Sequence, residues 1–238
     1  MPIFRLSLVA LFTLLLQGCY FLQKASVPIQ VDYFSAVQPT SSGPKALMIL
    51  LPGIGDDQTA FYKHGFVADV QQLWPTMEIA AVNGHFAYYQ NRSIVDRLVS
   101  DVVTPARQRG IERFYFAGIS LGGFGSLLYQ RDTDDDLAGI ILLAPYLGEE
   151  TNYQYLLSGG APPDPLTEDN IWPWLQKLPP EVRQRIYLGY GAQDKFAEAN
   201  TLLAQWLSEQ NVSVIPGKHN WKTWRPLWQN LLQAIPKT

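Results

Sequence analysis

The chain has 238 residues, of which 47% are hydrophobic, 13% aromatic and 16% charged. This length and apolar content are enough to bury one sizeable core, which excludes a disordered chain and favours a single domain. The net charge is −3 and Lys and Arg form no long run. Nucleic acid is therefore not an expected partner, because phosphate binding requires clustered positive charge.

The N-terminal residues are typical of an exported protein. Arg5 precedes an apolar run at residues 6–16, which is too short to cross a bilayer and fits a signal peptide. Residues 16–19 read LQGC, which resembles the bacterial lipobox and implies that Cys19 is lipidated, for example with palmitate. The alternatives are a signal anchor, or a cleaved signal with an incidental cysteine.

Cysteine usage agrees with lipidation. Cys19 is the only cysteine, so neither an intramolecular disulfide nor a cysteine nucleophile is expected. We therefore predict a signal peptide at residues 1–18 and a membrane-anchored lipoprotein of the cell envelope. Tyr20 rather than Asp follows the cysteine, which by resemblance to Gram-negative sorting implies the periplasmic face of the outer membrane.

The rest of the chain alternates between strand and helix patterns. We expect a tether at residues 19–43 with an early strand at 27–34, followed by one α/β domain at 44–238. Apolar runs typical of strands buried on both faces lie at residues 46–51, 78–82, 113–117, 139–144, 185–190 and 212–215. Helical patterns lie at residues 61–73, 93–109, 121–130, 197–210 and 224–234, with Asp101 interrupting the second apolar stripe. This order predicts a mostly parallel sheet with helices on both faces.

Residues 146–183 interrupt the alternation and are rich in Pro, Gly and aromatic residues. We expect a short lid-like insertion over the carboxyl edge of the sheet, where α/β proteins bind ligands. Trp172 and Trp174 either form an apolar lid or simply bury their rings.

A serine motif lies between a strand pattern and a helix pattern. Residues 118–122 read GISLG, which is G-x-S-x-G in the context that exposes a nucleophile, here Ser120. The helix that follows directs N–H groups and the positive end of its dipole toward the oxygen on which charge develops. The alternative is a glycine-rich turn with a structural serine.

A serine nucleophile needs a base, and the base needs an orienting carboxylate. Of His64, His85 and His219, only His219 follows both the motif and a suitable acid, which is the chain order Ser, acid, His. The alternative is a surface histidine beside tryptophans.

Asp194 is the expected acid because it directly follows a predicted strand. It is also placed to cap the next helix, and both roles are compatible. The competing acids, which fall in the insertion, are Asp164, Glu168 and Asp169.

Two N–H groups are expected to form an oxyanion hole. One belongs to Leu121, directly after the nucleophile. The second is expected from the glycine-containing loop after the first long strand, with Ile54 preferred and Gly53 or Gly55 as alternatives.

The substrate pocket has several candidate residues. Gly53, His85, Tyr88 and Trp221 are candidates for substrate binding, and Tyr89 lies beside them in the sequence. For the residues at 85–89, loop packing is the alternative.

Together these residues resemble the α/β-hydrolase superfamily over nearly all of residues 44–236. The segment at 118–127 resembles the serine motif of an esterase group that includes esterase D, and GKHNWKTW at 217–224 is similar to that group's G-x-H-x-W-x-x-W ending. The resemblance implies a serine hydrolase that cleaves a small-molecule or lipid-like carboxylic ester through Ser120, His219 and Asp194.

Other activities share this chemistry. A thioesterase, lipase, peptidase or acyltransferase could use the same triad, and a non-catalytic envelope binding protein is the alternative from another class. No metal or organic cofactor is expected, because three scattered histidines and one cysteine supply no ligand cluster.

Overall fold

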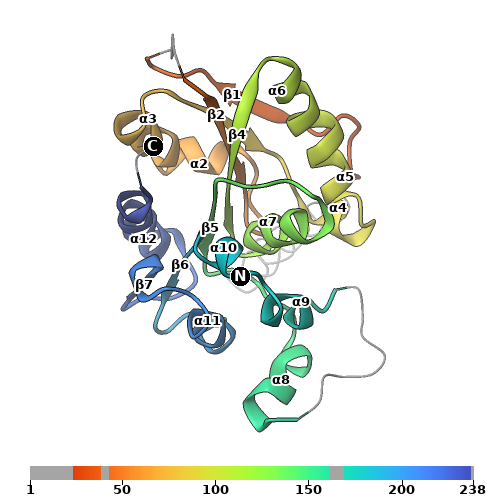
Figure 1. The fold of residues 1–238 in the computed structure, drawn as a ribbon, viewed down its shortest axis with the longest axis vertical. Coiled ribbons are helices and arrows are strands. Elements are labelled where there is room, and N and C mark those ends of the chain that lie inside the picture. Colours follow the sequence, from red (N-terminus) through yellow and green to blue (C-terminus); the bar gives the residue numbers. More distant parts are fainter. Residues whose placement is uncertain (1–23, 39–42, 161–168, 237–238) are drawn as a thin grey trace, which may run out of the picture.

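The computed structural model describes residues 24–38, 43–160 and 169–236 (Figure 1). The predicted signal peptide and Cys19 lie outside these ranges, as do the competing acids Asp164 and Glu168. Within the described residues, no helix is both long and apolar enough to span a bilayer.

A seven-stranded sheet forms the centre of the molecule (Figure 1). Its spatial order is β1-β3-β2-β4-β5-β6-β7. Every neighbouring pair is parallel except β1 and β3, so the expected mostly parallel sheet is confirmed. The strands are β1 (Val31–Phe34), β2 (Lys45–Leu51), β3 (Met77–Val82), β4 (Ile111–Ile119), β5 (Gly139–Leu143), β6 (Ile186–Gly191) and β7 (Val212–Ile215).

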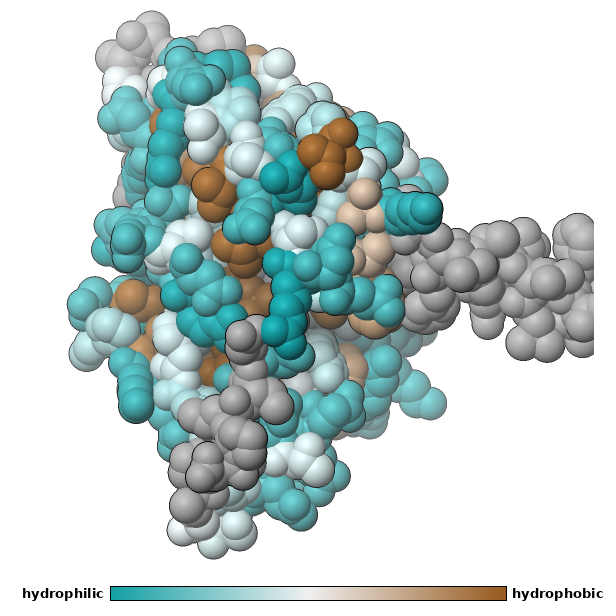
Figure 2. Space-filling view, turned by 90° about the vertical axis from the view of Figure 1, so that its right-hand side faces the viewer, coloured by the Kyte–Doolittle hydropathy of each residue, from teal (hydrophilic) through white to brown (hydrophobic). Residues whose placement is uncertain are grey.

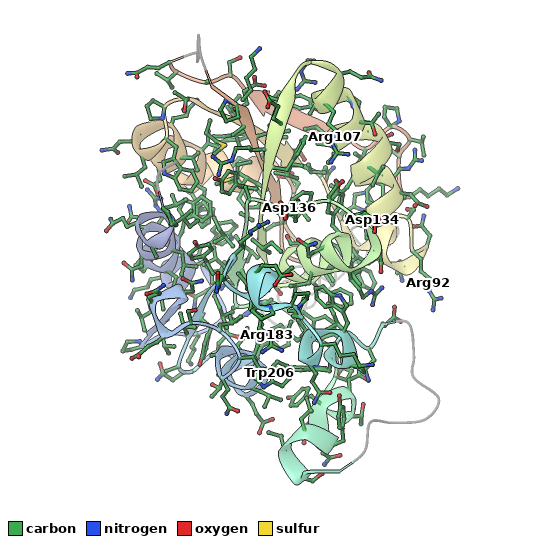
Figure 3. All side chains as sticks on the ribbon, viewed as in Figure 1. Arg92, Arg107, Asp134, Asp136, Arg183 and Trp206 are labelled. Carbon is green, nitrogen blue, oxygen red and sulfur yellow. The ribbon has the colours of Figure 1, made fainter. Side chains whose placement is uncertain are left out.

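The continuous apolar runs fold as central strands because helices cover both faces of the sheet. All residues of β5 and β6 are buried, whereas the short edge strands β1 and β7 are only partly buried. Figure 3 shows that side chains fill the space between the sheet and its helices. On the face seen in Figure 2, hydrophilic residues surround small, separate apolar areas.

Three expected helices differ in detail from the structure. The pattern at residues 197–210 forms α11 (Ala197–Ala204) and, after a break at 205–208, the 3₁₀-helix η2 (Glu209–Asn211). The pattern at residues 61–73 forms α2 (Thr59–Lys63) and α3 (Phe66–Leu73), because Gly65 between them adopts a φ of 79° that continues neither helix. The pattern at residues 93–109 forms α5 (Ile94–Arg97), the π-helix η1 (Leu98–Val103) and α6 (Thr104–Gln108) in direct succession.

Asp101, which interrupts the apolar stripe, binds the N-terminal segment. Its Oδ2 accepts a hydrogen bond from the backbone N of Ile29 at 2.8 Å and lies 3.5 Å from Nη1 of Arg97. A polar residue on this face of the helix therefore attaches residues ahead of β1 to the domain.

The remaining helices connect the strands or, in the case of α12, follow the last strand. They are α4 (Phe86–Gln90), α7 (Leu121–Asp132), α11 (Ala197–Ala204), the 3₁₀-helix η2 (Glu209–Asn211) and α12 (Trp221–Ala234). The insertion between β5 and β6 forms α8 (Glu150–Ser158), α9 (Trp172–Gln176) and α10 (Pro180–Arg183). Figure 1 shows α8 and α9 at the opposite end of the molecule from α6, which leads into the start of β4.

Trp172 is fully buried and its ring contacts those of Tyr153 and Trp206. For Trp172 the structure therefore supports ring burial rather than an apolar lid. Trp174 is half-buried against the core.

Candidate active site

Ser120 lies in the sharp turn between β4 and α7 with φ 53° and ψ −115°. A non-glycine residue rarely adopts a positive φ, so the surrounding structure must hold this conformation. The Ser120 N–H donates to the carbonyl of Leu143 at 2.9 Å, and the Ser120 carbonyl accepts from the N–H of Tyr146 at 3.0 Å. Contacts to the end of β5 and to the start of the insertion therefore hold the turn.

Two glycines allow the turn to pack this closely. A Cβ on Gly118 would overlap the carbonyl oxygen of Gly122, and a Cβ on Gly122 would overlap the carbonyl oxygen of Leu51. Since both obstacles are backbone atoms, no rotation of a side chain could relieve them. The close backbone packing of this turn therefore requires glycine at both positions.

Three residues predicted from the sequence meet at the carboxyl end of the sheet. Nε2 of His219 lies 2.9 Å from Oγ of Ser120, and Nδ1 lies 2.9 Å from each carboxylate oxygen of Asp194. Because an ionised carboxylate only accepts hydrogen bonds, Nδ1 carries the proton that it donates to Asp194. In a neutral ring, Nε2 is then the acceptor facing Ser120.

Asp194 has two structural roles at once. Oδ1 also accepts a hydrogen bond from the backbone N of Phe196 at 2.9 Å, and the Asp194 carbonyl accepts from the N of Ala197, the first residue of α11. The side chain is fully buried, whereas the His219 side chain is 15% exposed. The competing acid Asp169 is exposed and lines a cleft described below.

The loop that carries His219 is bound to the loop that carries Asp194. The N–H of Gln193 donates to the Gly217 carbonyl at 2.9 Å, and the Gln193 side chain accepts from the Gly217 N–H at 2.7 Å. The rings of Phe196 and Trp224 pack edge-on against the imidazole, at centroid distances of 5.0 and 4.9 Å. Both the position and the plane of the imidazole are therefore held.

The loop after β2 approaches the serine turn through Gly53. A Cβ on Gly53 would lie 3.5 Å from Cβ of Ser120, which is ordinary contact distance. Ile54 is 43% exposed. The N–H of Leu121 belongs to the first turn of α7, where backbone donors have no intrahelical acceptor.

Trp221, the first residue of α12, lies beside the loop that follows β2. Its ring stacks on His64, with centroids 4.0 Å apart and planes 8° apart. Burial raises the pKa of the Asp56 carboxyl, and the neighbouring Trp221 and His64 side chains oppose this rise. Sequence reasoning assigned no role to His64, because nothing in the sequence indicates a contact with a residue so far along the chain.

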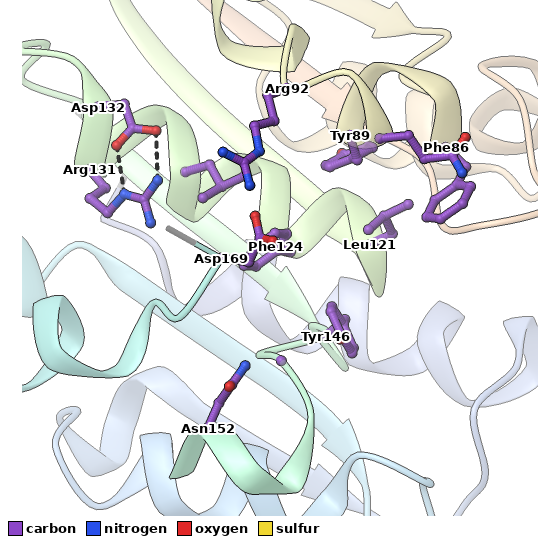
Figure 4. Close-up of a pocket in the computed structure, with 13 residues that line it drawn as sticks. Phe86, Tyr89, Arg92, Leu121, Phe124, Arg131, Asp132, Tyr146, Asn152 and Asp169 are labelled. Carbon is purple, nitrogen blue, oxygen red and sulfur yellow. Dashed lines mark hydrogen bonds and ion pairs between the residues drawn. The ribbon is translucent and has the colours of Figure 1, made fainter. Parts of the chain in front are cut away.

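A cleft of about 490 Å³ opens beside the serine turn and follows α7 (Figure 4). Its lining includes Tyr89 together with Phe86 and Arg92, which the sequence did not indicate. The helical spacing of Leu121, Phe124, Leu128 and Arg131 could have revealed the α7 side of the lining, because these residues share one face. The insertion contributes Tyr146, Gly148, Asn152 and Asp169.

His85 and Tyr88 lie beside the cleft lining rather than in it. Tyr88 is fully buried, and its hydroxyl accepts a hydrogen bond from the N of Ser26 at 3.0 Å. His85 packs against the Tyr88 ring, and burial lowers the pKa of its imidazole. The contacts of His85 and Tyr88 agree with the alternative interpretation, loop packing. A role in substrate binding stays a prediction for both residues, and also for Gly53 and Trp221.

Among the described residues, no group of three or more His, Cys, Asp or Glu side chains is arranged to hold a metal ion.

No protein-family model matches this chain, and no curated protein matches it. Solved structures do match. A ferulic acid esterase superposes with a TM-score of 0.61 at 13% identity, over 88% of this chain and 98% of its own. The fluorophosphonate-binding serine hydrolase FphF of Staphylococcus aureus gives 0.59 at 16% identity, over 88% and 100%. The S-formylglutathione hydrolase FrmB of the same species gives 0.58 at 15% identity, over 90% and 99%.

These likenesses and the strand order define the class to which the fold belongs. The chain has the α/β-hydrolase fold, with an insertion between β5 and β6.

Proposed function

We propose that the protein is a serine hydrolase that cleaves carboxylic esters, with Ser120 as nucleophile, His219 as general base and acid, and Asp194 as the orienting carboxylate. The observation that supports this most strongly is the unbroken hydrogen-bond chain from Asp194 through His219 to Ser120, each step 2.9 Å long. A structural serine in a glycine-rich turn would not require a buried imidazole–carboxylate pair beside its hydroxyl.

The proposed reaction begins when Nε2 of His219 takes the Ser120 hydroxyl proton while Oγ bonds to the substrate carbonyl carbon. The carbonyl π electrons move to the oxygen, and the resulting charge is stabilised by backbone N–H groups. Collapse of this intermediate expels the alcohol, which receives the proton from His219. A water molecule then gives a proton to His219 while its oxygen bonds to the acyl carbon. The bond between this carbon and Oγ of Ser120 breaks, the acid leaves, and His219 returns the proton to Oγ.

The N–H of Leu121 is the proposed first donor to the oxyanion, because it lies at the start of α7 directly after Ser120. The second donor comes from the loop after β2. Ile54 remains the preferred candidate, and the close approach of Gly53 to Ser120 supports the assignment to this loop.

The compared structures support an ester-type substrate at a coarse level. Their names include a ferulic acid esterase and a fluorophosphonate-binding serine hydrolase. The S-formylglutathione hydrolase among them favours a thioesterase as the second candidate.

We also propose that the protein is an envelope lipoprotein anchored through Cys19, at the periplasmic face of the outer membrane of a Gram-negative bacterium. The support is the LQGC sequence after an apolar run of signal-peptide length. The described domain begins close to this cysteine, since Ser26 is already bound to Tyr88.

A fluorophosphonate probe tests the proposed chemistry. We expect one adduct per molecule, located by peptide mass spectrometry at Ser120 and absent from Ser120→Ala. Turnover of p-nitrophenyl esters of increasing chain length, compared with matched thioesters, then separates the two candidate activities. A folded wild-type protein that neither reacts with the probe nor hydrolyses any ester or thioester would refute the proposal.

A further inference from the structure

Two aromatic rings border the hydrogen bond between Ser120 and His219. The Phe196 ring packs edge-on against the imidazole at a centroid distance of 5.0 Å, and the Tyr146 ring packs edge-on against Phe196 at 5.5 Å. The backbone N–H of Tyr146 in turn donates to the Ser120 carbonyl at 3.0 Å. These four residues form a closed circuit of contacts. The Phe196 and Tyr146 rings are thus an aromatic wall along one side of the reacting pair.

A buried asparagine holds the two parts of this aromatic wall together. Asn200 on α11 is fully buried, and its Nδ2 donates to the Phe196 carbonyl at 2.7 Å and to the Pro145 carbonyl at 3.3 Å. Because Pro145 directly precedes Tyr146, one amide group fixes the backbone at both rings. The Tyr146 hydroxyl donates to Oε1 of Glu149 at 2.8 Å. The polar end of that side chain is therefore already bound, and the aromatic wall presents ring carbon.

The aromatic wall is accessible to solvent, whereas the other ring that packs on the imidazole is not. Phe196 and Tyr146 are both only partly buried, but Trp224 is only 5% exposed. The His219 side chain itself keeps some exposed surface. A molecule that reaches the imidazole from solvent therefore meets the aromatic wall rather than Trp224.

The chemistry of an ester fixes which part of the substrate lies here. The leaving oxygen must come within hydrogen-bond reach of Nε2 of His219, because it receives its proton from that nitrogen. The carbonyl oxygen instead faces the proposed donors, the N–H of Leu121 and the loop after β2. The acyl chain has no obligatory contact with the imidazole. The first atoms of the alcohol therefore lie beside the aromatic wall.

An aromatic wall selects among alcohols by the surface that it removes from water. An apolar group gains from this burial, whereas a hydroxyl beside ring carbon loses its hydrogen bonds to water without a new partner. An aromatic group gains further from edge-on packing. Nζ of Lys195 lies 4.7 Å from the Phe196 centroid, so an alcohol with a carboxylate is the competing candidate. This ammonium is exposed, and water and salt weaken its attraction.

We propose that the substrate is an ester of a bulky apolar alcohol, best an aromatic one, which packs against Phe196 and Tyr146 as it leaves. This inference rests on the proposed function, because it takes His219 as the group that protonates the leaving oxygen.

Two matched series of esters test it. In the first, the alcohol of an acetate ester carries a phenyl, cyclohexyl, methyl, hydroxymethyl or carboxylate group at the same carbon. In the second, the same groups lie on the acid and the alcohol is ethanol. Each kcat/KM is divided by the rate constant of alkaline hydrolysis, which removes differences in intrinsic reactivity. In the alcohol series we expect the phenyl ester to exceed the methyl ester roughly tenfold, as removal of about 50 Å² of apolar surface from water provides.

Two substitutions tie this preference to the aromatic wall. In Phe196→Ala the phenyl-to-methyl ratio of the alcohol series should fall at least about threefold, while the ratio of the acyl series stays the same. Tyr146→Leu removes the other ring and should lower the same ratio, so it decides the test if Phe196→Ala does not fold. The control is Leu157→Ala, which shortens a 50% exposed apolar side chain on α8 and should keep both wild-type ratios.

The outcomes separate this inference from the proposed function. Suppose that a fluorophosphonate labels Ser120 and that esters are hydrolysed. A preference for the hydroxymethyl or carboxylate alcohol, or an unchanged alcohol ratio in the folded wall variants, would then refute the apolar alcohol and leave the serine chemistry standing. A ratio that falls in the acyl series instead would do the same. If neither labelling nor hydrolysis occurs, both proposals fall.

Discussion

Asp194 presents both carboxylate oxygens to Nδ1 of His219, each at 2.9 Å. One of them also accepts the N–H of Phe196. The acid is therefore fixed by the start of α11 while it orients the imidazole. The prediction that Asp194 caps this helix is wrong in detail, because the N-cap of α11 is Phe196 and no side chain caps it. Asp194 instead fixes the turn before the helix while it orients the histidine.

Asp194→Asn should separate these two roles. The amide oxygen can still accept from Phe196, so we expect the melting temperature to stay near the wild-type value. The amide nitrogen would instead donate to Nδ1 and impose the wrong tautomer, so kcat should fall by about 10⁴. Steady-state hydrolysis of a p-nitrophenyl ester measures this loss. Asp134→Asn, at an exposed position (Figure 3), is the control. Retention of wild-type kcat in Asp194→Asn would remove this residue from the mechanism.

Trp221→Phe should impair catalysis without affecting substrate binding. Phenylalanine keeps an aromatic ring beside His64 but lacks the indole N–H that favours the ionised form of Asp56. Asp56 lies in the loop that approaches Ser120 through Gly53. We expect kcat to fall roughly tenfold, the effect of one hydrogen bond to a charged group. KM should change little, because Trp221 does not line the cleft.

The control for this variant is Trp206→Phe, at a half-buried tryptophan whose ring contacts Trp172 (Figure 3). Its kcat should match that of the wild type. A Trp221→Phe protein with a raised KM and an unchanged kcat would instead support the role in substrate binding that the sequence predicts for Trp221.

Gly122→Ala should be strongly destabilising, because the new methyl group would overlap the carbonyl oxygen of Leu51. Overpacking against backbone costs about 3 kcal/mol. For a protein of this size that corresponds to a decrease of roughly 6–12 °C in Tm. Gly160→Ala is the matched control, since its Cβ would have no neighbour closer than 3.4 Å. Equal thermal denaturation curves for the two variants would show that the serine turn does not require a glycine at 122.

The proposed anchor is tested by Cys19→Ser. Because serine cannot accept a thioether-linked lipid, we expect the variant to leave the membrane fraction, whereas the wild type stays there until detergent is added. Immunoblots of fractionated cells measure the distribution. If the two proteins distribute alike, the membrane association has another origin.

Much of the sheet could be predicted because its central strands are buried on both faces. A strand of this kind must be apolar throughout, as residues 139–143 and 186–191 are. Ser120, His219 and Asp194 could be placed for a related reason. Each follows a strand, and the carboxyl ends of parallel strands lie at one edge of the sheet.

The cleft was less predictable. The helix at Phe86–Gln90 has five residues, which is too few for an apolar period to show which side faces the cleft. The sequence placed His85, Tyr88 and Tyr89 near the pocket, but the rotation of this helix turns Phe86 and Tyr89 toward it and Tyr88 toward Ser26. Long-range packing decides that rotation.

The proton path from Oγ of Ser120 to Nε2 of His219 is tested most directly by the rate at which a fluorophosphonate labels Ser120. In His219→Ala the second-order rate constant should be about 10³-fold below that of the wild type, because the general base is missing. In Lys218→Ala, at the exposed neighbouring position, it should be unchanged. A His219→Ala protein that reacts at the wild-type rate would contradict the mechanism.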